Sequence, residues 1–210
     1  MSALYGIWHG PTGLTNIARR VRFRTELLVT QLNEMGVKIV TDKDNFFDTI
    51  AIDSVASDLG SADAVLAEFH KFGINLRKID ESVVGISMNE YTTIRDLAEL
   101  LEIFAILKDV SPEEADEPYL ESSFCDADSY RGMPSQLARS GSFMQQSVFN
   151  TLTSETEFMR YIHRLCDKDL GLTDGMIPLG SCTMKLNSAV VMAPITYEGF
   201  ANIHPFAPRD

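Results

Sequence analysis

Apolar side chains recur at helical spacing along the first part of the chain, with arginines largely between them. This pattern predicts an amphipathic helix from Leu14 to Met35, ended by Gly36. Ahead of it, the run from Gly10 to Gly13 is a poor continuation of a helix, because it holds a proline without an amide hydrogen and glycines that cost backbone entropy. We therefore expect a separate, shorter helix over residues 4–9 that breaks at this run.

The next part of the chain alternates between strand-like and helix-like patterns. Val37 to Val40 and Phe47 to Ile52 are rich in β-branched and aromatic residues and predict two strands, and Ser82 to Met88 predicts a third. Helical spacing returns over Ala62 to Phe69 and over Ile94 to Ala105. These strands and helices are interpreted as parts of one compact domain.

The order helix, strand, strand, helix, strand, helix predicts one small α/β domain, of the α+β kind, over residues 1–107. We expect its helices to cover one face of a mostly antiparallel sheet. Either Thr92 or Thr93 is suited to cap the last helix of this domain. Residues 108–154 combine an acidic, proline-bounded stretch with Gly, Ser and Gln, which is typical of a linker.

The remaining residues, 155–210, begin with a predicted helix from Thr156 to Cys166. Beyond it, Ile177 to Asp210 is rich in proline and glycine and also in large apolar side chains. A segment of this kind cannot bury its own apolar surface, so we expect it to need a partner surface.

The composition of the chain restricts its function further. Its 210 residues are 45% hydrophobic and carry a formal net charge of -12, which is typical of a globular protein and makes nucleic acid or an anionic membrane an unfavourable partner. No apolar stretch approaches the roughly 20 residues that span a bilayer. The N-terminus shows neither a secretory nor a transit pattern.

The cysteines and histidines give little evidence of a metal site. Cys125, Cys166 and Cys182 lie far apart and form no ligand spacing, so a reducing compartment is the simplest interpretation and no metal is predicted. His70 and His163 fall within helical patterns and are interpreted as surface residues.

The most distinctive segment runs from Met176 to Asn187. In it, Gly180 is followed by Ser181, Cys182 and Thr183, three small side chains able to offer hydrogen bonds to a carboxylate or phosphate. An ordinary polar loop that caps the next helix is the alternative. A hydrolase based on Cys182 or Ser181 is a weak third possibility, because the local sequence supplies no base for the cysteine.

Two further groups are candidates for binding. His204 is flanked by Ile203 and Pro205 in a rigid aromatic context that would hold an imidazole in one orientation. The arginines between Arg19 and Arg24 suggest an anion site, but helical periodicity favours a solvated or interface face instead.

Several runs of sequence together resemble one known family. They are IPLGSCTMKLN at 177–187, APITYEGFANIHPF at 193–206, HGPTGLTNIARRV at 9–21 and FFDTIAID at 46–53. These runs resemble glycine decarboxylase, the P-protein of the glycine cleavage system, also called glycine dehydrogenase (aminomethyl-transferring, decarboxylating). The resemblance extends over nearly the entire chain.

The resemblance implies a fold-type I pyridoxal-phosphate enzyme built as two related halves, on one chain or as paired subunits. On this interpretation residues 1–107 are the small domain closing the N-terminal half, 108–154 a linker, and 155–210 the incomplete start of the C-terminal half. The implied activity is that of an oxidoreductase of glycine catabolism. Glycine is decarboxylated on pyridoxal phosphate, and the aminomethyl group passes to the lipoyl arm of the H-protein.

The resemblance also implies where the site lies. The family's cofactor lysine belongs to a later His-Lys segment that this chain lacks, so Lys185 is not given that role and no catalytic residue is expected here. Ser181, Cys182 and Thr183 are implied to line the pocket entrance, with His204 as a second choice.

We therefore expect the isolated chain, as an internal fragment, to be inactive. A non-enzymatic interaction module derived from the same family is the alternative. The implied setting is the cytoplasm in bacteria or the mitochondrial matrix in eukaryotes, with the parent a homodimer or a dimer of halves.

Overall fold

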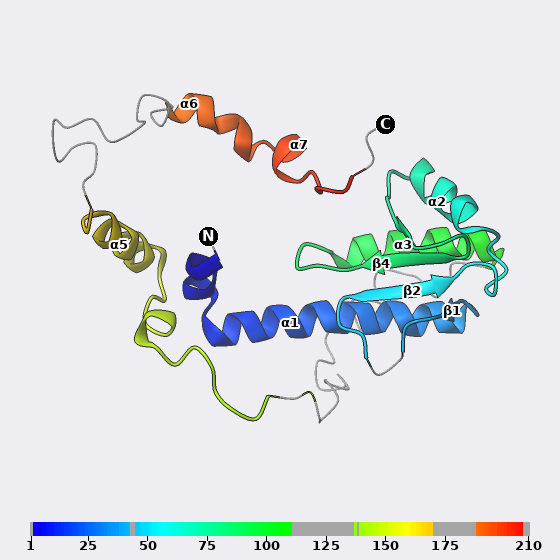
Figure 1. Cartoon of the computed structure of the whole chain (residues 1–210), viewed down its shortest axis with the longest axis horizontal. Helices are drawn as coiled ribbons and strands as arrows, with labels where there is room; N and C mark the ends of the chain where they lie inside the picture. The colour runs from blue at the N-terminus through cyan, green and yellow to red at the C-terminus, as the bar shows by residue number, and fades with distance from the viewer. Residues whose placement is uncertain (1, 43–44, 111–136, 138, 170–187, 208–210) are drawn as a thin grey trace. The chain divides into compact units, whose positions relative to one another are not determined.

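A computed structural model describes residues 2–42, 45–110, 137, 139–169 and 188–207 (Figure 1). It divides into two compact units, Met1–Asn150 and Thr151–Asp210, which are described separately below.

The long helix α1, Ser2–Glu34, is broken once along its length. At Gly10 the backbone takes φ 61° and ψ -179°, a conformation that only glycine adopts without strain. The helix resumes at Pro11, a first-turn position where the missing amide hydrogen costs nothing. The predicted break is therefore confirmed, with a first segment over residues 2–9 and a second over residues 11–34.

The end of α1 is fixed by Gly36, as predicted. Gly36 has φ 75°, and its amide donates to the Asn33 carbonyl at 3.0 Å while the Val37 amide donates to Leu32 at 2.8 Å. This pair of bonds forms a Schellman motif, which uses carbonyls that the helix end would otherwise leave without partners.

Helices α2, Ala62–Lys71, and α3, Ile94–Lys108, complete the helical layer of the first unit. Of the two predicted capping threonines, Thr93 is the one that starts α3, and it forms a capping box with Asp96.

The sheet has the strand order β1-β2-β4-β3, and all of its described pairs are antiparallel. Its strands are β1 (Lys38–Ile39), β2 (Thr49–Asp53), β3 (Arg77–Lys78) and β4 (Val83–Ser87). In the central pair Ile50 lies opposite Ile86 and Ile52 opposite Val84, so these apolar residues share one face.

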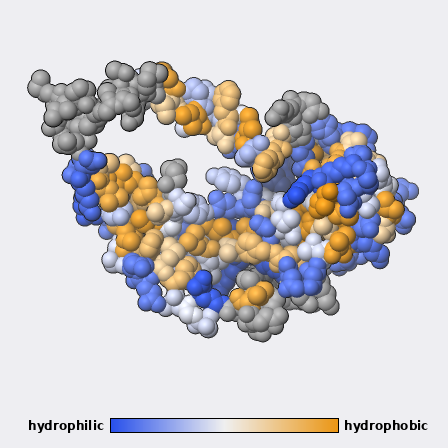
Figure 2. Space-filling view, viewed as in Figure 1, coloured by the Kyte–Doolittle hydropathy of each residue, from blue (hydrophilic) through white to orange (hydrophobic). Residues whose placement is uncertain are grey.

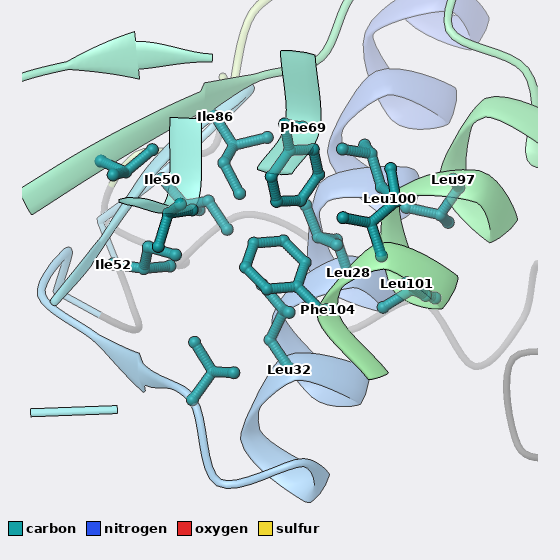
Figure 3. Close-up of a cluster of buried hydrophobic side chains, with 14 of the residues drawn as sticks. Leu28, Leu32, Ile50, Ile52, Phe69, Ile86, Leu97, Leu100, Leu101 and Phe104 are labelled. Atoms are coloured by element: carbon teal, nitrogen blue, oxygen red, sulfur yellow. The ribbon is translucent and has the colours of Figure 1, made fainter. Parts of the chain in front are cut away.

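Side chains of α1, α2 and α3 pack on this apolar face; Figure 3 labels Leu28, Phe69 and Phe104 among them. Phe69 of α2 and Phe104 of α3 meet edge to face with their ring centroids 4.9 Å apart. The large, fully buried side chains around them are Leu28, Leu32, Val37, Ile50, Ile52, Val65, Val84, Leu97 and Leu101. The predicted small α/β domain with a mostly antiparallel sheet is therefore confirmed.

The described residues of the second unit form short elements. They are α5 (Glu155–Cys166), α6 (Ala189–Met192), the 3-10 helix η5 (Ala193–Thr196) and α7 (Glu198–Ala201). The predicted helix ending at Cys166 is confirmed and begins one residue earlier. None of the described side chains in this unit is buried.

The proposed domain limits lead to a proteolysis prediction. Limited digestion should cut first between Lys108 and Gly141, because α1, α2, α3 and the sheet share one core whose backbone is hydrogen-bonded. Mass spectrometry of early fragments locates the cuts. Resistance between these residues, with early cleavage inside Leu14 to Met35, would contradict the boundary.

Candidate functional site

The predicted pocket loop lies outside the described residues. This holds for Ser181, Cys182, Thr183 and Lys185. Lys185 was given no role, so the candidates are Ser181, Cys182, Thr183 and His204. Of these, His204 is described, and it is exposed. The roles of all four candidates therefore remain predictions.

His204 is held in one orientation by its own turn. Its Nδ1 accepts a hydrogen bond from the Phe206 amide at 3.1 Å, and its ring lies 5.7 Å from the Phe206 ring. An acceptor at Nδ1 requires the proton of the neutral imidazole to be on Nε2. Nε2 is thus the ring nitrogen left free to donate.

The segment that carries His204 exposes its apolar side chains. Glu198 is its one acidic or basic residue, apart from His204, between residues 188 and 207. Val190 is 81% exposed and Phe206 90% exposed. Figure 2 shows hydrophobic side chains over α6 and η5. This exposure agrees with the expectation that the segment needs a partner surface to bury its apolar side chains.

Helix α5 has a well-formed N-terminal cap, but none of its residues is buried. The Ser154 hydroxyl accepts from the Glu157 amide at 3.2 Å, and the Glu157 carboxylate accepts from the Thr153 amide at 3.3 Å. His163 and Arg164 occupy its last turn, where cations are favoured by the helix dipole. Met159 is nevertheless 57% exposed.

The arginines of α1 are the clearest correction to the sequence analysis. Arg22 is only 4% exposed, its guanidinium lies 3.5 Å above the Phe46 ring, and Nη1 donates to the Phe46 carbonyl. Arg24 is 9% exposed and donates to the Thr92 carbonyl. For these two residues the interpretation as a solvated or interface face is wrong.

The two buried arginines therefore do not form an anion site. Burial lowers the pKa of the Arg24 guanidinium, nearby Arg20 lowers it further, and Asp96 acts in the opposite direction. Each arginine binds a backbone carbonyl of a distant loop. Their role is to attach those loops to α1. Arg19 and Arg20 are exposed, as the sequence predicted.

A third attachment joins the start of α1 to the turn before α3. The Tyr5 hydroxyl donates to the Glu90 carboxylate, and the Tyr5 ring lies 4.3 Å from that of His9. This hydrogen bond is the main cause of a raised pKa for the Tyr5 phenol, because it favours the protonated form.

The part of the chain that the structure describes contains neither a cluster of metal ligands nor a helix that could span a membrane. Across those residues no three His, Cys, Asp or Glu side chains come together as a metal site. None of the described helices is both long enough and apolar enough to cross a bilayer.

Comparison with known proteins gives the relationship. Residues 1–104 match the family model "Glycine cleavage system P-protein". A mitochondrial protein of Schizosaccharomyces pombe, named as a glycine dehydrogenase (decarboxylating), is 44% identical over 220 residues, covering 100% of this chain and 20% of its own length. The chain belongs to the glycine cleavage system P-protein family.

Bacterial members of the P-protein family align equally fully. The glycine dehydrogenase (decarboxylating) of Xanthomonas oryzae is 41% identical over 100% of this chain and 19% of its own length. That of Synechocystis is 42% identical over 99% of this chain and 20% of its own length. The chain thus spans about a fifth of the length of the curated relatives it matches.

The Tyr5–Glu90 attachment of this P-protein chain has a pH signature. Because the hydrogen bond requires a protonated phenol, it persists below the ordinary tyrosine pKa and is lost as the pH rises through the raised value. Glu90→Gln should lower the pKa of Tyr5 toward its ordinary value. Titration followed by NMR of ring-labelled tyrosine measures this shift. An unchanged Tyr5 pKa in Glu90→Gln would contradict the assignment, and Glu99→Gln is the control.

Proposed function

We propose that this chain is the junction between the two related halves of a P-protein. Residues 1–107 close the first half as the small domain of a fold-type I pyridoxal-phosphate transferase, 108–154 join the halves, and 155–210 open the second. The observation that carries the proposal is 41–44% identity over the whole chain to relatives five times as long. The family model also ends at residue 104, within α3, the last helix of the first core.

The activity proposed for the whole protein is decarboxylation of glycine, with transfer of the aminomethyl group to the lipoyl arm of the H-protein. Pyridoxal phosphate would supply an electron sink for the carbanion left when carbon dioxide departs. Membership of the glycine cleavage family supports this proposal, and so does the printed name of each relative.

The described residues do not fit a covalent cofactor site. A lysine that forms a Schiff base needs a neutral amine, which proteins obtain by lowering its pKa. Lys78 instead lies 2.8 Å from Asp63, and hydrogen bonding to that carboxylate raises its pKa. Lys71 pairs with Glu68 at 2.5 Å.

The other described lysines fit no better. Lys108 donates to the Ser57 carbonyl at 2.8 Å, which holds its amine against the loop before α2. Lys38 and Lys168 are exposed. The described lysines therefore offer no attachment point for pyridoxal phosphate, and we propose that the isolated chain is inactive.

Borohydride reduction tests this part of the proposal. After incubation with pyridoxal phosphate and reduction, intact-mass spectrometry should show no stoichiometric pyridoxyl adduct, because the family's attachment lysine lies in a segment that this sequence does not contain. Free lysine under the same conditions is the control for reduction. A stoichiometric adduct at Lys185 would overturn the assignment.

The pocket loop is tested in a protein that includes the downstream domain. Ser181→Ala and Thr183→Ala should each lower glycine decarboxylation by about tenfold or more while leaving the fold intact, because they remove hydrogen bonds to the substrate carboxylate. Exchange of labelled carbon dioxide with glycine is the measurement. Ser87→Ala, at an exposed position of β4, is the matched control. If both loop variants keep the full rate of exchange, the site assignment is wrong and the loop only caps the next helix.

The exposed apolar segment around α6 favours one other function, that of a non-enzymatic interaction module. Sequencing the gene beyond the codon for Asp210 distinguishes the two proposals. Codons that continue into the rest of a P-protein support the enzyme, and an immediate stop codon supports the module.

A further inference from the structure

A compact loop over residues 142–150 packs on the first segment of α1. Beneath it lie Gly6 and Gly10, four residues apart and both buried. A Cβ atom on Gly6 would lie 3.3 Å from Met144 Cε and 3.8 Å from the Phe149 ring. A Cβ on Gly10 would lie 2.9 Å from the Phe149 carbonyl oxygen, closer than real contacts allow. The loop therefore approaches α1 where α1 has no side chains.

The residue between these glycines shows that the contact is a buried one. Ile7 is 6% exposed, yet it is not part of the core cluster formed by the sheet and the three helices. The cluster begins along α1 only at Val21. Because η3 (Ser147–Phe149) is in contact with α1, we attribute the burial of Ile7 to the loop.

The loop has its own internal hydrogen bonds. The Asn150 side-chain amide donates to the Met144 carbonyl at 2.8 Å and to the Gln146 carbonyl at 3.0 Å. The Phe149 amide also donates to Gln146, at 3.1 Å. These bonds fix the shape of the loop locally, so presentation of Met144 and Phe149 does not depend on the chain that precedes it.

We propose that the glycine face of α1, made of Gly6, Ile7 and Gly10, is a docking surface for residues 142–150 of the same chain. The surface holds the loop without help from the covalent connection through residues 111–136. Small residues on one partner and Met and Phe on the other give the close, apolar contact that docking requires. This inference is independent of the proposed enzymatic function.

Cutting the covalent connection tests the docking surface directly. A protease recognition sequence is inserted into the full chain within residues 111–136, and the folded protein is cleaved under native conditions. Size-exclusion chromatography with mass detection should then show both pieces eluting together with the mass of one chain. Separation of the pieces would overturn the proposal. A mass of two chains would also overturn it, because the loop would then be supplied by a second copy.

Two variants and one control show that the named contact holds the pieces together. Gly6→Val places methyl groups against Met144, and Phe149→Ala removes the ring over Gly6. Each should weaken association of the cleaved pieces by about tenfold or more. Gly141→Ala, where an added Cβ meets nothing within 4 Å, should leave association unchanged.

The two variants differ in which partner they alter. If Gly6→Val does not fold, Phe149→Ala still decides the matter, because it leaves residues 1–110 unchanged. Association of the Phe149→Ala pieces as tight as that of the parent would overturn the proposal, whatever other contacts remain.

Discussion

The edge-to-face contact between Phe69 and Phe104 is the interaction on which the first unit depends. It joins α2 to α3 directly above the apolar face of β2 and β4, and Leu28 and Leu32 of α1 are buried in the same cluster. A buried aromatic ring contributes a large area to a core, and truncating one costs about 3–5 kcal/mol. Because this pair joins two helices through their rings at the centre of the cluster, the rest of the layer is arranged around it.

The buried arginines extend this core to its loops at a cost in desolvation. Removing a guanidinium from water is unfavourable unless its donors find acceptors. Arg22 uses the face of Phe46 and its carbonyl, and Arg24 uses the carbonyl of Thr92. The loops before β2 and before α3 are thereby fixed to the same helix. Substitution of either arginine would therefore act on loop position as well as on charge.

Most of the first unit was predictable because its signals are local. Glycine is a local signal for the end of a helix, and the proline after Gly10 strengthens it, which is why the break at Gly10 and the end at Gly36 were predicted. The end of α3 uses Asp109 at φ 53° instead, and a non-glycine residue gives a much weaker signal. Strand β3 was not predicted as a strand, because its two residues are charged and its pairing with β4 is a tertiary contact.

The burial of Arg24 was also readable from the sequence. It lies three residues after Val21 and four before Leu28, so it falls on the same helical stripe as the apolar residues. The sequence analysis assigned the arginines between Arg19 and Arg24 to a solvated or interface face as a group, although this spacing sets Arg24 apart from the others. By contrast, the packing of residues 142–150 on α1 has no local signal. A contact between residues about 140 positions apart cannot be inferred from Gly, Ser and Gln content.

The second unit shows why the structure does not test the candidate site beyond the placement of His204. Its helices have ordinary caps and turns, but the described apolar side chains, such as Val190 and Phe206, have no core to enter. At roughly 25 cal/mol for each square ångström of exposed apolar surface, such a segment gains most of its stability from whatever covers it. A pocket formed by this segment would take its geometry from the surface that covers it. The orientation of His204 within its turn is fixed locally, by the hydrogen bond from the Phe206 amide to Nδ1, and does not depend on a covering surface.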